Sequence, residues 1–249
     1  MTHPGTTVAV VQQLHLAGYN QSQISRMTGI NRSSVGEWIR GGRTRSQGSC
    51  SHEVDQCARR TTLPGPAYVY LLGLYLGDGC ISTCPRDVFK LRITCCDAYP
   101  HLMDLCEEAM VAVLPNRVGR VHRVGCTELY SHSKHWPCLF PQHGPGRKHE
   151  RSIVLAPWQL ELVEQHPKEL LRGLIHSDGC RSINTATGGR RKYWYWRYMF
   201  TNVSEDIRGL FCSTCDQLGI EWRQMNAKNI SVAKRASVEF MDTFIGPKY

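Results

Sequence analysis

Apolar residues in the first forty or so positions recur with the period of short amphipathic helices. The pattern predicts three helices, over 8–17, 21–28 and 32–40. Gly18 ends the first helix, and Asn31 is placed to cap the third. The side chains expected to face inward are Ile24, Met27, Ile30, Val35, Trp38 and Ile39. Residues 1–45 are therefore predicted to form a small all-α unit.

After residue 66 the pattern runs twice through one series of elements: helix, hairpin, helix, strands and a closing segment. The first series comprises a helix ending at Asp78, a hairpin over 81–94, a helix over 99–113, strands over 117–131 and a segment with Lys134. The second comprises a helix ending at Asp178, a hairpin ending at Thr201, a helix over 204–218, strands, Lys234 and a closing helix. The predicted domains are a helical domain at 1–45, a linker at 46–66, a first lobe at 67–141, a connector at 142–155 and a second lobe at 156–249.

Two ten-residue segments carry the clearest sign of duplication. GLYLGDGCIS at 73–82 and GLIHSDGCRS at 173–182 lie 100 positions apart and share six of ten residues. Each segment places small residues four apart, which lets two helices approach closely along one face. These residues are Gly73 and Gly77 in the first segment and Gly173 and Ser177 in the second. Two such helices side by side bring Asp78 and Asp178 together.

The composition favours a polyanionic partner. The net charge is +9 and the pI is near 9.0, which favours nucleic acid. The chain carries no apolar stretch long enough to span a bilayer and no secretory signal at its start. We expect a cytoplasmic, nucleoid-associated protein that acts as a monomer, without a membrane or protein partner.

The twelve cysteines are not expected to form a disulfide framework in a chain of this length without an export signal. Cys80 and Cys180 follow the two Asp-Gly pairs and are predicted to be small buried residues. Three groups have loose metal-ligand spacing: Cys212-x-x-Cys215, His132-x-x-His135-x-x-Cys138 and Cys50-x-His52. Each group is open to two interpretations. It forms a zinc site, or its cysteines are free thiols and its histidines pack in the structure.

The segments LLGLYLGDG and LRGLIHSDG resemble the two motifs of a single-chain LAGLIDADG homing endonuclease. The resemblance implies an α+β fold in which two α-β-β-α-β-β-α lobes form a saddle over DNA. It implies a site for Mg²⁺ or Mn²⁺ made by Asp78 and Asp178 with the preceding Gly77 and Ser177. It also implies that Lys134 and Lys234, again 100 apart, lie near the metals and that Arg92 organises water.

The N-terminal helices resemble the helix-turn-helix of resolvase-like and transposase-like DNA-binding domains, in which the third helix enters the major groove. In the second-lobe hairpin, alternation places Arg191, Tyr193, Tyr195 and Arg197 on one face and Lys192, Trp194, Trp196 and Tyr198 on the other. The predicted DNA contacts are Arg32, Ser33, Ser34, Arg40, Arg43, Arg147, Lys148, Arg190, Arg191, Lys192 and Arg197.

The leading hypothesis is a site-specific endonuclease that hydrolyses double-stranded DNA with Mg²⁺, aided by the helix-turn-helix. One acid from each lobe suits one cut in each strand of a duplex. The alternative is a non-catalytic, sequence-specific transcriptional regulator built on the same scaffold. A third hypothesis is a cofactor for RNA splicing.

Overall fold

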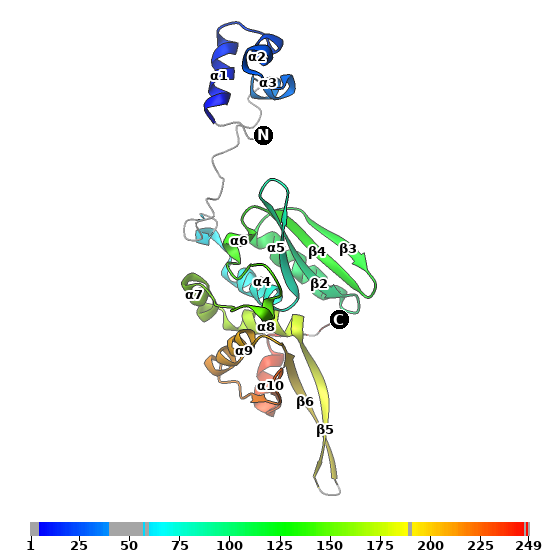
Figure 1. Cartoon of the computed structure of the whole chain (residues 1–249). Helices are drawn as coiled ribbons and strands as arrows, with labels where there is room; N and C mark the ends of the chain where they lie inside the picture. Colours follow the sequence, from blue (N-terminus) through cyan, green and yellow to red (C-terminus); the bar gives the residue numbers. More distant parts are fainter. Residues whose placement is uncertain (1–4, 40–56, 58–59, 189–190, 247, 249) are drawn as a thin grey trace. The chain divides into compact units, whose positions relative to one another are not determined.

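The computed structural model describes residues 5–39, 57, 60–188, 191–246 and 248 (Figure 1). The chain divides into two compact units, Met1–Ser49 and Cys50–Tyr249. Most of the predicted linker at 46–66 lies outside the described residues; its final part holds a short 3-10 helix, Arg60–Thr62. Among the described residues, no helix combines the length and the apolarity needed to cross a bilayer.

The N-terminal unit contains three short helices: α1 (Gly5–Leu16), α2 (Gln21–Thr28) and α3 (Arg32–Ile39). Asn20 caps α2 by accepting hydrogen bonds from the N–H groups of Ser22 and Gln23, and Asn31 accepts from the N–H of Ser33. The fully buried core consists of Val11, Ile24, Ile30 and Val35. Met27 was predicted to face inward, which is wrong: it is 56% exposed.

The first lobe begins with α4 (Gly65–Asp78), followed by a hairpin of β1 (Gly79–Cys84) and β2 (Val88–Cys96). Helix α5 (Pro100–Val113), strands β3 (Val118–Arg123) and β4 (Cys126–Ser133) and the short helix α6 (Trp136–Leu139) complete it. The strands form one antiparallel sheet in the order β1-β2-β4-β3. The connector that follows contains one 3-10 turn, Lys148–Glu150.

The second lobe has the same strand order, β5-β6-β8-β7. Its elements are α8 (Pro167–Asp178), β5 (Gly179–Gly188), β6 (Arg191–Thr201), α9 (Glu205–Gln217), β7 (Arg223–Gln224), β8 (Asn229–Val232) and α10 (Arg235–Asp242). An additional helix, α7 (Pro157–Gln165), precedes α8, so the predicted single helix is in fact two. Pro167 explains the break, because the residue before a proline is driven out of the helical conformation, and His166 is outside it.

Helices α4 and α8 pack directly against each other at the small residues of the repeated segments. A Cβ atom on Gly73 would lie 2.8 Å from the Cα of Gly173, and one on Gly173 would lie 2.3 Å from the carbonyl oxygen of Tyr70. One helical turn further on, a Cβ atom on Gly77 would lie 2.2 Å from the hydroxyl of Ser177. Only residues without bulk allow this approach, and it carries both helix ends to one place.

Each sheet has one face on the core and one open face. In the first lobe Ile81, Leu91, Ile93 and Leu129 are buried against the helices. The adjacent cross-strand row, Cys80, Arg92 and Tyr130, therefore faces the open side. Cys80 and Cys180 occupy equivalent open-face positions and are exposed, so the prediction that they are buried is wrong.

Candidate active site

Asp78 and Asp178 are the last residues of α4 and α8, where the two packed helices end. The Oδ2 atom of Asp178 lies 3.1 Å from the position of a Cβ on Gly77, the neighbour of Asp78. Protein packed around Asp78 raises the pKa of its carboxyl to about 6, and the negative charge of Asp178 adds to the shift. Burial also raises the pKa of Asp178, although Asn202 donates a hydrogen bond to its Oδ2 (2.6 Å) and opposes the effect. The structure thus brings both acids to one site.

Two lysines stand beside these acids. Lys148 donates hydrogen bonds to the carbonyl oxygens of Tyr75 (2.5 Å), Leu76 (2.9 Å) and Gly77 (2.6 Å), in the last turn of α4. Lys248 donates to the carbonyl oxygen of Gly179, directly after α8. Each motif helix therefore ends on one acid and one ammonium group.

The charges of Lys148 and Lys248 lower the pKa values of both acids and so oppose the effect of burial. Burial in turn lowers the pKa of Lys148 to about 8 and also lowers that of Lys248. The pKa of Asp78 stays raised because burial, together with the negative charge of Asp178, outweighs the effect of the two lysines.

The fold of the connector places Lys148 at the end of α4. The guanidinium of Arg151 donates hydrogen bonds to the carbonyl oxygens of Gly144 (3.0 Å), Pro145 (3.1 Å) and Gly146 (2.9 Å). These bonds stabilise the turn before Lys148. Gly146 has φ +75°, a conformation that favours glycine. Lys148 was predicted to contact DNA; in the structure its three N–H donors bind carbonyl oxygens of α4 instead.

The prediction that Lys134 and Lys234 lie at the acids is also wrong. Gly79, next to Asp78, pairs with Ile93, and Ile93 pairs with Leu129, so Leu129 is level with the acid in the sheet. Lys134 comes five residues after Leu129, which places it about 16 Å further along the strand direction. In the second lobe Ile230 is level with Gly179 in the sheet, because both pair with Phe200. Lys234 comes four residues after Ile230, which places it about 13 Å further along the strand direction. Lys234 forms an ion pair with Glu221 instead.

The spacing of Lys148 and Lys248 is a signal in the sequence, because they too are 100 residues apart. Lys248 directly follows Gly246-Pro247, and Lys148 comes three residues after Pro145. Because Lys134 and Lys234 keep the same offset, spacing alone does not separate the two pairs. Only the register of the strands and the path of the connector do.

The predicted metal ligands fit a hard divalent cation in part. Two carboxylates at the negative ends of two helices provide the oxygen donors and the charge that Mg²⁺ prefers. The carbonyl of Gly77 suits the cation less well, because a cation bound there would meet the positive charge of Lys148, which donates a hydrogen bond to the same oxygen. The hydroxyl of Ser177 donates to the carbonyl oxygens of Gly173 (3.0 Å) and Leu174 (3.1 Å), within its own helix. The carboxylates of Asp78 and Asp178 are thus the donors that suit the cation.

Arg92 lies on the open face of the first sheet, where its guanidinium is 3.9 Å from Glu128. Cys80 pairs with Arg92 and Cys180 pairs with Met199, so the second-lobe counterpart of Arg92 is a methionine. Arg197 instead matches Lys90, since these residues pair with Ser182 and Ser82. Within the described residues, the buried Nε atoms of Arg92 and Arg197 have no hydrogen-bond partner. Each open face therefore carries a partly buried guanidinium group, Arg92 in the first lobe and Arg197 in the second.

The β5–β6 hairpin extends well beyond the rest of its sheet, because β8 pairs only with the last four residues of β6, Tyr198–Thr201 (Figure 1). Strand register confirms the two predicted faces. Both faces are exposed, at Tyr193 (51%), Trp194 (69%), Tyr195 (37%) and Trp196 (47%). Lys192 is also exposed, whereas Arg190 and the side chain of Arg191 lie outside the described residues. Neither face of this ribbon is covered by the lobe.

The remaining predicted DNA contacts are scattered. Arg32 and Ser33 are exposed at the start of α3, and Ser34 is half-buried. Arg40 and Arg43 lie outside the described residues. Arg147 is largely exposed beside Glu150, at 4.0 Å.

His176 stands two residues before Asp178, in the seam between α4 and α8. The hydroxyl of Tyr70 shares a hydrogen bond of 2.9 Å with its Nδ1, and its Nε2 lies 2.8 Å from the carbonyl oxygen of Ile245. Burial lowers the pKa of His176 to about 4, so the ring is neutral at pH 7. It links the seam to the C-terminal segment that carries Lys248.

No protein-family model matches the chain, and no curated protein does. Solved structures do resemble it. The LAGLIDADG meganuclease I-AabMI bound to uncleaved DNA is 11% identical, with a TM-score of 0.46, and the match covers 71% of this chain and 82% of that one. A variant of I-DmoI in complex with its target DNA is 14% identical, with a TM-score of 0.48, over 74% of this chain and 95% of that one.

The N-terminal LAGLIDADG domain of DUF199/WhiA is 13% identical, with a TM-score of 0.45. This match covers 77% of the chain and 88% of that domain. At these identities the function has to be drawn from the residues of the chain itself.

Proposed function

We propose that the chain is a site-specific endonuclease of LAGLIDADG type that hydrolyses both strands of double-stranded DNA with Mg²⁺ or Mn²⁺. The observation that carries the proposal is the joint site of Asp78 and Asp178. Each acid ends one copy of a duplicated helix, and each helix end bears its own lysine. A pair of equivalent half-sites suits two equivalent scissile phosphates related by a pseudo-twofold axis.

When bound, Mg²⁺ supplies Lewis-acid stabilisation of the negative charge that builds up on the phosphate and the leaving oxygen. The two carboxylates hold the cation, and Asn202 fixes the orientation of Asp178 through the hydrogen bond to Oδ2. Lys148 and Lys248 keep positive charge next to the acids and oppose their mutual repulsion. Because the three donors of Lys148 are bound to α4, this lysine acts by position rather than by direct contact with phosphate.

The open faces of the two sheets are the proposed DNA surface. They carry Arg92, Arg197 and Lys90, whose positive charges suit DNA phosphates. An extended β-ribbon such as β5–β6 fits the width of the major groove. The N-terminal helices add affinity for a flanking sequence, with Arg32 and Ser33 at the start of α3 as contacts, since joining two binding modules raises the effective concentration.

The proposal is tested by selecting cleaved targets from a randomised duplex library with Mg²⁺, and then assaying Asp78→Asn and Asp178→Asn on the selected target. We expect each substitution to abolish cleavage while binding in Ca²⁺ is largely retained. The matched control is Asp87→Asn, in the turn between β1 and β2, where φ is +56° and asparagine is tolerated. Full cleavage by the Asp78→Asn variant, or no cleavage by the wild type across the library, would refute the enzyme assignment.

One observation favours the second candidate function, a non-catalytic DNA-binding regulator on the same scaffold. Lys148 already occupies the carbonyl of Gly77 and stands beside both acids, so an internal ammonium can take the place of a metal ion. Calorimetric titration with Mg²⁺ separates the two functions. The endonuclease requires uptake by the wild type that the Asp78→Asn/Asp178→Asn double variant lacks, whereas the regulator requires DNA binding that does not respond to Mg²⁺.

A further inference from the structure

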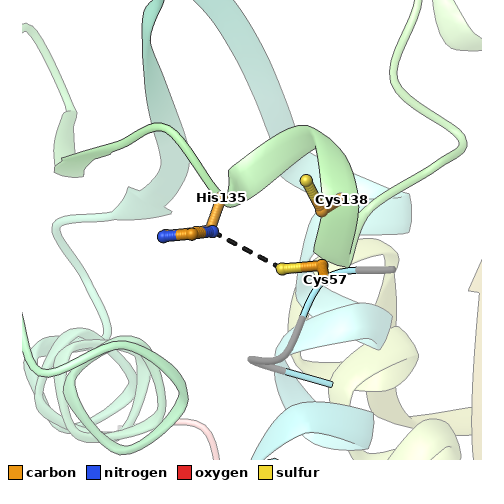
Figure 2. Close-up of side chains that lie close together, drawn as sticks. All are labelled: Cys57, His135 and Cys138. Atoms are coloured by element: carbon orange, nitrogen blue, oxygen red, sulfur yellow. Dashed lines mark hydrogen bonds between the residues drawn. The ribbon is translucent and has the colours of Figure 1, made fainter. Parts of the chain in front are cut away.

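Away from the two acids, three side chains of types that can bind metals meet where the segment before α4 lies beside α6. The ligand atoms of Cys57, His135 and Cys138 all lie within 4.8 Å of one another (Figure 2). The Sγ atom of Cys57 is 3.5 Å from the Nδ1 atom of His135. Both cysteines are almost fully buried, at 6% and 2% exposure, and His135 is half-buried. Seventy-eight residues separate Cys57 from His135, so the fold, and not local sequence, assembles the group.

The local structure presents these side chains to one point. His135 comes directly before α6, and its N–H donates to the hydroxyl of Ser133 at 3.1 Å, which fixes the backbone as β4 ends. Cys138 follows three residues later within α6, so one helical turn places it on the same side as His135. Figure 2 shows Cys57 on a separate segment beside α6, with its sulfur directed towards the ring of His135.

The distances suit zinc. Tetrahedral Zn²⁺ with bonds of about 2.3 Å to sulfur and about 2.0 Å to nitrogen separates a sulfur and a nitrogen ligand by about 3.6 Å and two sulfurs by about 3.8 Å. The observed 3.5 Å between Cys57 and His135 matches, and ligand atoms no more than 4.8 Å apart reach the rest by small side-chain rotations. Two thiolates also neutralise the divalent charge, which removes the main cost of burying it. Soft sulfur with imidazole selects zinc over Mg²⁺.

We infer that Cys57, His135 and Cys138 bind a structural Zn²⁺ ion. A water molecule or a further protein donor completes the tetrahedron. The ion ties the segment before α4 to α6, which already contacts α4 through the hydrogen bond from the Tyr68 hydroxyl to the carbonyl oxygen of Leu139 (2.6 Å). The site thereby stabilises the start of α4, and it is independent of the acids at the other end of that helix.

The test is the metal content of the full-length protein, purified without chelator after growth with zinc and measured by mass spectrometry. We expect about one Zn²⁺ per chain, and at least a tenfold lower content, about the loss typical of a damaged metal site, in Cys57→Ser and Cys138→Ser. Cys180→Ser, which changes an exposed cysteine of the second lobe, is the matched control and keeps its zinc. The Asp78→Asn/Asp178→Asn variant also keeps it, so failure of the endonuclease proposal leaves this one standing.

A second measurement on the wild type covers the case in which the serine variants do not fold. Cys57 and Cys138 should resist alkylation until a chelator is added, and then react as free thiols without any reductant. The Co²⁺-substituted protein should show thiolate-to-cobalt charge-transfer absorption. Zinc content no higher in the wild type than in the Cys57→Ser/Cys138→Ser variant, or a Cys57–Cys138 disulfide in the purified protein, would overturn the inference.

Discussion

The close packing of α4 and α8 makes Gly173→Ala a sharp test of the proposed site. A Cβ at this position would lie 2.3 Å from the carbonyl oxygen of Tyr70 and 2.9 Å from the Cα of Gly73, where ordinary contacts begin at 3.4 Å. Both neighbours are backbone atoms, so neither can rotate away. The helices must therefore separate by about 1 Å, and Asp178 at the end of α8 moves with them.

The magnitude follows from two opposing effects. Overpacking against rigid backbone costs about 3 kcal/mol, the upper end of the usual range, and the better helix propensity of alanine returns about 1 kcal/mol. We expect a net loss of about 2 kcal/mol in the free energy of unfolding, which lowers the Tm by about 4–8 °C for a unit of this size. The control is Gly209→Ala in α9, where a Cβ would meet no heavy atom within 4 Å. This variant should gain up to about 1 kcal/mol.

The assay is urea unfolding of the two variants and the wild type, followed by Mg²⁺-dependent cleavage of the selected target. A displacement of about 1 Å at Asp178 should lower the cleavage rate about a hundredfold. If Gly173→Ala is as stable as Gly209→Ala, the helices are not in contact through their glycines. The geometric basis for joining the two acids then fails.

Three further predictions concern the site and the DNA surface. Because the pKa of Asp78 is raised to about 6, Mg²⁺ affinity should fall about tenfold per pH unit below pH 6, measured by calorimetry, and a pH-independent affinity would contradict this. The same raised pKa means that the stability contributed by protonated Asp78 in the metal-free protein is present below pH 3.8 and lost as the pH rises through 6. The pKa of His176 is lowered from 6.5 to about 4, so the stability from its neutral form is present above pH 6.5 and lost as the pH falls towards 4. Urea unfolding should show that, between about pH 7 and about pH 5, the free energy of unfolding falls by about 2 kcal/mol more for the wild type than for His176→Gln. The contribution of Asp78 is the same in both proteins and cancels. Equal losses would rule out a buried neutral ring. Arg197→Ala should weaken DNA binding and reduce the slope of log K against log salt by about one, without a change in Tm, whereas Arg235→Ala, paired with Glu239 on the exposed side of α10, should leave the slope unchanged.

Much of the architecture followed from patterns along the chain. The alternation of apolar and polar residues located both hairpins and both helices that follow them, because strand and helix periods differ and each lobe buries only one face of each element. The repeated small residues located the α4–α8 contact, because only they permit backbone approach. Elements interrupted by local chemistry were missed, as at Pro167, where one predicted helix is two.

The sequence by itself determined the duplication, the two acids and the helices that end on them, since these depend on residue type at a regular spacing. Tertiary structure alone decided which lysines join the acids, because Lys148 and Lys248 arrive on a connector and a terminal segment that have no periodicity. It also brought Cys57, which belongs to none of the loosely spaced groups in the sequence, to His135 and Cys138. Cys57 reaches His135 and Cys138 across 78 residues through the packing of α4 against α6, a contact that no local spacing encodes.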